Sequence, residues 1–237
     1  MNKTKIEWVK NPDGSQGFTS NPISGLCPVG CWYCYGKKLY KRKLNKYFDE
    51  QLVFWSHRLD KIQKRKKSAG IFMCSTFEIF HPVTNTSVPW NPYTTWRDVI
   101  FRTMANCPQH RFYILTKYPQ NIDRPMPDNV YLGVSITKNE DIWRRNRLVT
   151  SNAKIKFISF EPLLEDLDFY LYQKIDWIII GRLTQHGYKH DPKLRWITKI
   201  VRNCADYGVK VFLKDNLKPI WGNNLIQQLP GEINANP

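Results

Sequence analysis

The segment Ile155-Lys156-Phe157-Ile158, followed at once by Ser159-Phe160-Glu161-Pro162, shows the pattern from which the fold can be predicted. A short, mainly apolar run ends abruptly in polar or charged residues. Five other runs repeat this pattern, at residues 71–74, 112–115, 130–134, 177–181 and 209–213. Short apolar strands separated by helices are typical of a parallel sheet that is covered on both faces. We therefore expect an α/β fold.

The segments between these runs predict the helices and the domain organisation. Apolar residues at helical spacing indicate helices at about 49–67, 94–106, 138–149 and 191–207, the last capped by Asp191-Pro192. The connectors 119–129 and 165–176 are too short for a full helix, and 18–20 is a candidate first strand. No linker divides the chain, so we predict one domain over residues 1–237.

The expected parallel sheet has about six or seven strands. A complete eight-stranded barrel usually takes about 250 residues, with regular helices throughout. A partial or irregular (β/α) barrel therefore fits the pattern better than a complete one. An open doubly wound sheet is the alternative.

Polar side chains follow each predicted strand at the point where the apolar run stops. They are Glu78, Thr116, Lys117, Ser135, Glu161, Arg182, Thr184, Lys214 and Asp215. Any one of them could simply begin a solvated loop. However, ligands of parallel α/β folds bind at the carboxyl ends of the strands, so this series predicts a single site at that edge.

Glu161 is the most informative of these residues because it lies between Phe160 and Pro162, in a stretch that is otherwise apolar. A buried carboxylate needs a partner or a shifted pKa. Glu161 therefore predicts either contact with a ligand hydroxyl or ammonium group, or a structural ion pair. Lys117, Lys214 and Asp215 are further candidates for binding ligand charges or for moving protons, and with Glu161 they form the predicted catalytic set.

A loop at residues 27–34 carries Cys27, Cys31 and Cys34 in a C-x3-C-x2-C spacing. Three thiolates in one short loop can bind one metal ion or cluster. A structural zinc site normally has four ligands, and here a fourth would have to come from a distant residue such as His57 or His81. An iron–sulfur cluster held by three thiolates leaves one iron open. The other cysteines, Cys74, Cys107 and Cys204, lie in or beside apolar patterns and are expected to be small buried residues.

The composition indicates the cellular compartment of the protein and the class of its binding partner. No apolar run approaches the roughly 18–20 residues that a membrane span needs, and the N-terminus lacks the apolar stretch of a signal peptide. We expect a cytoplasmic protein with no membrane contact, whose six cysteines are reduced and more suited to metal than to disulfides. The net charge of +16 indicates a polyanionic partner.

The basic residues are clustered. The first run follows the cysteine loop and consists of Lys37, Lys38, Lys41, Arg42, Lys43 and Lys46. The second run ends a predicted helix and consists of Lys61, Lys64, Arg65, Lys66 and Lys67. The third run lies on another predicted helix and consists of Arg144, Arg145 and Arg147. Any single run could be a solvated helix face. Together with the net charge, the three runs favour binding to the phosphates of RNA or DNA.

The cysteine loop resembles the C-x3-C-x(aromatic)-C motif of the radical S-adenosylmethionine (SAM) superfamily, with Tyr33 as the aromatic residue. Beyond this loop, the chain resembles a small radical-SAM-like family of unknown function found in phages, bacteria and archaea. The segments that carry the resemblance are residues 6–8, 21–22, 30–31, 34–35, 115–117, 132–135, 159–164 and 178–181. Members of that family often have a Gly-Gly-Glu-Ser-Gly-like segment where this chain has Gly181-Arg182-Leu183-Thr184-Gln185.

The resemblance implies a partial (β/α) barrel of the radical SAM type. It implies a [4Fe–4S] cluster on Cys27, Cys31 and Cys34, with SAM chelated at the open iron and cleaved reductively to a 5′-deoxyadenosyl radical. It also implies an external electron donor such as flavodoxin or ferredoxin. The cofactor-binding residues implied by the resemblance are Tyr33 along the adenine, Glu78 at the SAM ammonium, Ser135 and Glu161 at the ribose or methionine, and Gly181 beneath the adenine.

Three functions follow from these observations. The first is a radical SAM enzyme that modifies or repairs nucleic acid or a nucleotide-like anion. The second is the same chemistry on a small molecule or peptide. The third is a nucleic-acid-binding protein without catalytic activity, whose cysteine loop holds a structural metal.

Overall fold

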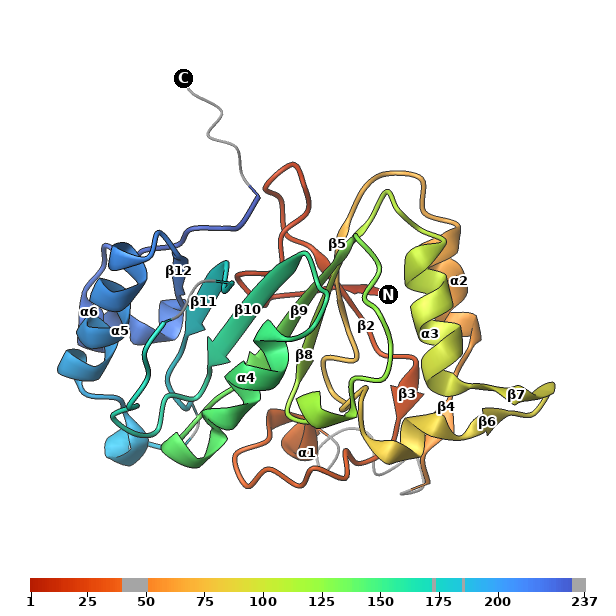
Figure 1. Ribbon diagram of the computed structural model, residues 1–237, viewed down its shortest axis with the longest axis horizontal. Helices are drawn as coiled ribbons and strands as arrows, with labels where there is room; N and C mark the ends of the chain where they lie inside the picture. The colour runs from red at the N-terminus through yellow and green to blue at the C-terminus, as the bar shows by residue number, and fades with distance from the viewer. Residues whose placement is uncertain (40–50, 172–173, 185, 232–237) are drawn as a thin grey trace. The chain divides into compact units, whose positions relative to one another are not determined.

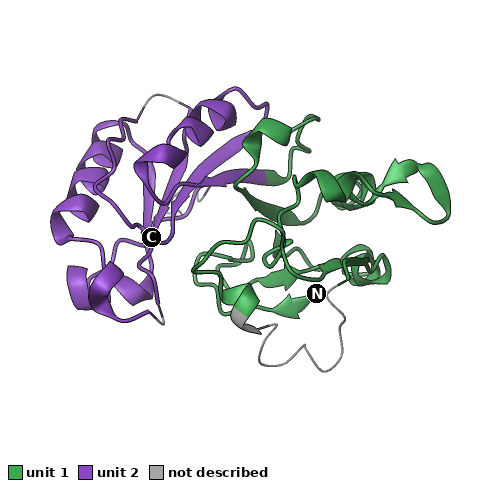
Figure 2. Cartoon of the chain, turned by 90° about the horizontal axis from the view of Figure 1, so that it is seen from below, with its two compact units in different colours: residues 1–130 green, residues 131–237 purple. Residues whose placement is uncertain are grey.

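The computed structural model describes residues 1–39, 51–171, 174–184 and 186–231. The chain divides into two compact units, residues 1–130 (unit 1) and 131–237 (unit 2), which are coloured separately in Figure 2. The prediction of a single domain over the whole chain stays a prediction. Each unit is described by itself.

The sheet strands of unit 1 lie in the order β1-β2-β5-β8 (Figure 1). Their bounds are Asn2–Lys3, Phe18–Ser20, Gly70–Met73 and Arg111–Thr116. β1 is antiparallel to β2, while β2, β5 and β8 are parallel, with Phe18 opposite Ile71 and Ile71 opposite Phe112. The carboxyl ends of these three strands therefore lie at one edge of the sheet.

Three α-helices and two small two-stranded sheets accompany these strands in the part of unit 1 that the structure describes. α2 (His57–Gln63) and α3 (Trp96–Ala105) lie side by side in Figure 1. α3 begins at a capping box, in which the Thr95 hydroxyl accepts from the Asp98 N–H at 3.2 Å and the Asp98 carboxylate accepts from the Thr95 N–H at 2.7 Å. One antiparallel sheet pairs β3 (Ile23–Ser24) with β4 (Val53–Phe54), and the other is a hairpin of β6 (Ser87–Val88) and β7 (Asn91–Thr95). A short α1 (Tyr35–Leu39) follows the cysteine loop.

A buried arginine holds the segment that follows β5. Arg97 of α3 is only 1% exposed. Its Nε donates to the Ile79 carbonyl at 3.2 Å and its Nη2 to the His81 carbonyl at 3.1 Å, while its Nη1 meets Asp123 at 2.7 Å. Thr84 accepts a further bond from Nε at 3.0 Å. Because a guanidinium offers five donors in a rigid fork, one side chain can fix several carbonyls of an irregular loop.

The four strands of unit 2 are all parallel and lie in chain order, β9-β10-β11-β12. Their bounds are Val130–Ser135, Ile155–Phe160, Trp177–Ile180 and Lys210–Leu213. Ser135 is opposite Ser159, and Phe160 is opposite Ile180, which is in turn opposite Leu213. This register places the polar residues that follow the strands at one edge of unit 2.

The α-helices in the described part of unit 2 are α4 (Trp143–Val149), α5 (Leu194–Asp206) and α6 (Lys218–Trp221). α5 buries Ile197, Ile200 and Cys204, which are spaced three or four residues apart and so share one helical face. β9 needs a glycine at position 133, because a Cβ there would lie 2.4 Å from the Phe157 ring of the neighbouring strand.

The α/β class with a mostly parallel sheet is confirmed, and the predicted strands fall within one or two residues of the observed ones. The predicted helix at 49–67 is wrong in extent: within the described residues β4 comes first, and α2 covers only seven residues. The predicted helix cap at Asp191 is also wrong. α5 begins at Leu194, because Asp191 instead pairs with Arg182 at 2.7 Å. Among the described residues, no helix has both the length and the apolar character needed to cross a membrane.

Candidate functional site

The cysteine loop folds as two consecutive turns. The Gly30 N–H donates to the Cys27 carbonyl at 3.3 Å, and the Cys34 N–H donates to the Cys31 carbonyl at 3.1 Å. Gly30 has a φ of +67°, a left-handed conformation that favours glycine. All three thiols are free and half-buried. The turns therefore bring the three cysteines into one compact stretch of backbone.

This loop is anchored to the chain that leaves β5. The Tyr35 hydroxyl donates to the Ser75 carbonyl at 2.9 Å. A Cβ at Gly36 would lie 3.4 Å from Cys34 Sγ and 4.0 Å from Thr76. Because β5 ends at Met73, the thiols of the loop lie beside the carboxyl edge of the unit 1 sheet.

Burial changes the acidity of the Cys27 thiol. Burial raises its pKa to about 11, against the opposing effect of N–H groups from Val29 and Glu78, and the nearby charges of Glu78 and Cys31 raise it further. Burial likewise raises the pKa of Cys74, which also lies near Glu78 and Cys27. A thiol must lose its proton to ligate a metal, so these neutral thiols would require a bound cation to ionise.

Glu78 braces the ends of two strands. Its Oε1 accepts from the Thr116 hydroxyl at 2.6 Å and from the Phe80 N–H at 3.0 Å, and its Oε2 accepts from the Lys117 N–H at 2.7 Å. Burial raises the pKa of this carboxyl, while the same three donors oppose the rise. Glu78 thus has a structural partner set of its own, and its predicted contact with a SAM ammonium stays a prediction.

Lys117 reaches the cysteine loop from the end of β8. Its Nζ lies 5.7 Å from the centre of the Tyr33 ring, within the range of a cation–π interaction. Unit 1 therefore brings together four of the predicted elements of the site: the thiols, Tyr33, Glu78 and Lys117. The Tyr33–Lys117 contact gave no signal in the sequence, because the two residues are far apart along the chain.

The remaining predicted residues belong to unit 2, where Glu161 and Lys214 form an ion pair through Oε1 and Nζ. Both side chains are largely buried, with 29% and 14% of their surface exposed. A Cβ at Gly181 would lie 3.0 Å from Lys214 Cδ and 3.2 Å from Glu161 Cδ. The pair therefore occupies the space that a side chain at position 181 would fill. This packing explains the glycine at position 181 without a ligand.

Two serines lie next to each other in register on β9 and β10. Ser135 is 3% exposed and Ser159 is fully buried. Within the described residues, the Ser159 hydroxyl has no hydrogen-bond partner. Buried hydroxyls are usually satisfied, so an unpaired one two residues before Glu161 is consistent with a polar ligand at this edge. Ser159 was not predicted as a site residue, although it directly precedes Phe160-Glu161 in the sequence.

Asp215 does not join the Glu161–Lys214 pair. It is exposed, and it pairs with Lys218 at 3.2 Å and accepts from Gln227 at 3.4 Å. Its neighbour Asn216 exchanges hydrogen bonds with the Arg182 backbone, at 3.2 Å and 3.0 Å. These contacts suit a structural role, and the catalytic role predicted for Asp215 stays a prediction.

The basic runs differ in how their side chains are used. In the third run, Arg144 pairs with Asp141 at 2.9 Å and Arg145 donates to the Tyr170 carbonyl at 2.6 Å, whereas Arg147 is exposed. In the second run, the lysines are exposed, and Lys67 pairs with Asp13 at 3.1 Å. In the first run, Lys41, Arg42, Lys43 and Lys46 lie outside the described residues, as does the side chain of Lys38.

The fold and site together define a mixed α/β protein with a three-cysteine loop beside a parallel sheet edge. Residues 3–228 match the family described as "Protein of unknown function (DUF5131)", and the chain belongs to that family. No curated protein and no solved structure matches the chain.

The assignment to the radical SAM superfamily is corrected on two findings. The family that matches is one of unknown function, and its description names no radical SAM chemistry. In the part of the chain that the structure describes, no group of three or more His, Cys, Asp or Glu side chains has the arrangement of a metal site. The spacing of the cysteines led to the superfamily, but spacing alone does not fix where thiol sulfurs point.

Proposed function

We propose that the chain is an enzyme that cleaves SAM reductively at a [4Fe–4S] cluster held by Cys27, Cys31 and Cys34, in a partial (β/α) barrel in the reducing cytoplasm. The observation that carries this proposal is the loop itself. Its three free thiols occupy two consecutive turns beside the carboxyl edge of a parallel sheet. The proposal rests on this donor chemistry and not on family membership.

The donor set fits such a cluster. Thiolates are the usual protein ligands of iron–sulfur clusters, and three of them leave one iron for an outside ligand. When bound, the cluster and SAM would supply a 5′-deoxyadenosyl radical that abstracts hydrogen from the substrate. Among the described residues, no three His, Cys, Asp or Glu side chains are arranged to hold a metal ion. The loop would therefore have to change conformation to bring its three sulfur atoms together around a cluster.

In unit 1, the residues around the loop would hold and orient the ligands. Tyr33 offers a half-buried aromatic face, and Lys117 beside it offers a cation for a carboxylate or phosphate. In unit 2, taken by itself, the partly exposed Glu161 carboxylate is available to a hydroxyl or an ammonium group of a ligand.

The substrate proposed is nucleic acid or a nucleotide-like anion. It is supported by the net charge of +16 and by the exposed lysines at the end of α2. An electron donor such as flavodoxin or ferredoxin would reduce the cluster.

Anaerobic reconstitution with iron and sulfide tests the proposal. The wild-type protein should bind both elements and, with dithionite and SAM, release 5′-deoxyadenosine. Replacement of Cys27, Cys31 or Cys34 by Ala should abolish iron binding and this release. Cys107→Ala and Cys204→Ala are matched controls, because both thiols are buried in apolar surroundings.

Two results would overturn the proposal. One is a colourless protein that contains stoichiometric zinc and no iron, which would favour a structural metal. The other is an equal loss of iron in the loop variants and in the two controls.

A further inference from the structure

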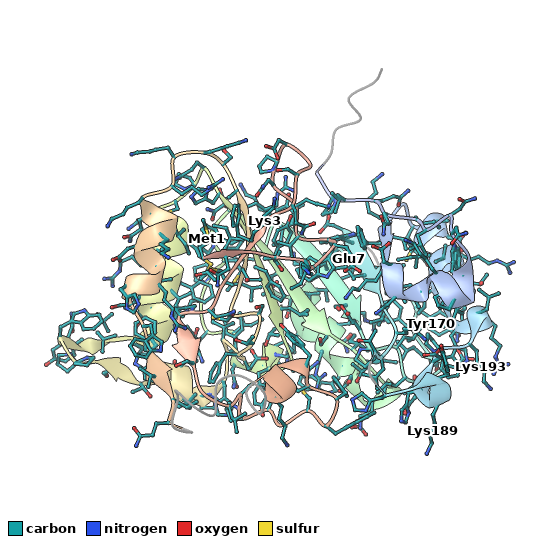
Figure 3. All side chains as sticks on the ribbon, turned by 180° about the vertical axis from the view of Figure 1, so that it is seen from behind. Met1, Lys3, Glu7, Tyr170, Lys189 and Lys193 are labelled. Carbon is teal, nitrogen blue, oxygen red and sulfur yellow. The ribbon has the colours of Figure 1, made fainter. Side chains whose placement is uncertain are left out.

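One corner of unit 2 combines exposed tyrosines with exposed cations, and we call it the α5 face. Figure 3 shows Tyr170, Lys189 and Lys193 gathered there, around the 3₁₀ turn Tyr188–His190 and the start of α5. The α5 face is defined by Tyr170, Tyr188, Lys189, Lys193, Arg195, Lys199 and Arg202.

The two tyrosines present their rings to solvent from anchored positions. Tyr188 is 79% exposed and Tyr170 is 60% exposed. The Arg182 guanidinium lies 5.5 Å from the Tyr188 ring centre. The Tyr170 carbonyl accepts from Arg145 at 2.6 Å, and the next residue, Leu171, donates from its N–H to Asn203 of α5 at 2.9 Å. The backbone at Tyr170 and the ring of Tyr188 are thus anchored, which lowers the ordering cost when a flat partner stacks on these residues.

The cations of the α5 face are mostly available to an anion. Among the described residues, no carboxylate pairs with Lys189 or Lys193. Arg195, Lys199 and Arg202 follow at a spacing of four and three residues, which places them on one side of the helix. Asp166 lies against two of them, 3.2 Å from Lys199 and 3.8 Å from Arg195.

This face is continuous with the Glu161–Lys214 pair through Arg182. The Arg182 backbone exchanges hydrogen bonds with Asn216, two residues after Lys214. Its guanidinium pairs with Asp191 at 2.7 Å and lies over Tyr188. A strand bound along the α5 face would therefore lead to the carboxyl edge of the unit 2 sheet.

From this combination we infer that the α5 face binds single-stranded nucleic acid, an inference that rests on the substrate class in the proposed function. Exposed aromatic rings stack on bases whatever their sequence, and lysines and arginines track the phosphates. A duplex offers phosphates but keeps the faces of its bases inside the stack. The tyrosines therefore select a single strand over a duplex.

Fluorescence anisotropy with a labelled single strand of about 20 nucleotides tests this, as DNA and as RNA, with the duplex for comparison. The full-length chain should bind the single strand more tightly than the duplex. Tyr170→Ala and Tyr188→Ala should each weaken single-strand binding by about tenfold, with little effect on the duplex. The double variant K189A/K193A should weaken binding and make the slope of log K against log salt shallower by about 1.4.

The matched control is K154A/K210A, which removes the same charge from the amino ends of β10 and β12, and it should leave the affinity within about twofold of wild type. Equal weakening by this control, or unchanged binding in both tyrosine variants, would overturn the inference. All variants alter exposed side chains, so each variant should fold like the wild-type protein. An unfolding midpoint equal to that of the wild type verifies this. Binding is measured without iron or SAM; loss of SAM cleavage would therefore leave the inference standing, and loss of strand binding would leave the cluster proposal standing.

Discussion

At the scale of single residues, the Glu161–Lys214 ion pair leaves no room for a side chain at position 181. A Cβ at this position would press on Lys214 Cδ at 3.0 Å and on Glu161 at 3.2 Å. We expect Gly181→Ala to lower the free energy of unfolding by about 1–3 kcal/mol, because the pair would have to shift in a packed site. Urea unfolding measures this change.

A double-mutant cycle separates the clash at Gly181 from other effects. Lys214→Ala removes the nearest atoms, so Gly181→Ala should cost less in that background than in the wild-type protein. An identical cost in both backgrounds would contradict the steric explanation.

The buried His110 predicts a pH dependence of stability. Burial lowers its pKa below the ordinary value of about 6.5, although Nε2–H donates to the Ile62 carbonyl at 3.2 Å. The unfolded chain therefore takes up the proton more readily than the folded chain. Stability that is present above the ordinary pKa should be lost as the pH falls below it.

His110→Gln keeps an N–H donor for Ile62 but removes the titration. Urea midpoints compared between about pH 7.5 and 5.5 should therefore fall less in the variant than in the wild-type protein. A parallel fall in both proteins would assign the dependence to other groups, such as His81, whose pKa burial also lowers.

At the scale of elements, Arg97 joins α3 to the segment after β5. It is fully buried, and its guanidinium meets the carbonyls of Ile79 and His81 as well as the Asp123 carboxylate. Arg97→Met should lower the free energy of unfolding by about 2–4 kcal/mol, because it removes the hydrogen bonds of a buried guanidinium to Ile79, His81 and Asp123, each worth about 1 kcal/mol. Arg102→Met, on the exposed side of the same helix, should change it by no more than about 0.5 kcal/mol.

The helices and strands also show how much secondary structure the local sequence pattern predicts. Apolar runs predicted the parallel strands well, because strands buried on both faces tolerate only such residues. No strand was predicted at the β6–β7 hairpin, because its residues, rich in Asn, Pro and Thr, carry no apolar alternation. α5 begins later than expected because Asp191 finds a tertiary partner in Arg182, and no local rule signals that pairing.

The candidate site was predictable only in part for a similar reason. Glu161 was correctly expected to be partly buried, and its partner proved to be Lys214, which was also selected as a strand-end residue. Glu78 was selected for a ligand, yet within the structure it braces Thr116 and Lys117. Sequence position shows which residues reach the sheet edge, whereas the partner of each side chain depends on packing between segments far apart in the chain.

At the scale of the whole molecule, the net charge of +16 should make polyanion binding strongly dependent on salt. Six phosphate contacts on a single strand would give a slope of log K against log salt of about −4, which lowers the affinity about 300-fold between about 50 and 200 mM salt. Salt titrations of strand binding by the full chain measure this slope.

Variants of the second basic run test whether lysines outside the α5 face also bind phosphates. Removing Lys61, Lys64 and Lys66 together should weaken single-strand and duplex binding alike, because exposed lysines read phosphates and not bases. Variants of the α5 face tyrosines should differ by affecting the single strand alone. A strand with uncharged methylphosphonate linkages is the control, and its binding should lose most of the salt dependence. A salt slope near zero with the natural strand would show that the excess positive charge does not bind phosphates, and the basic runs would then be solvated helix faces.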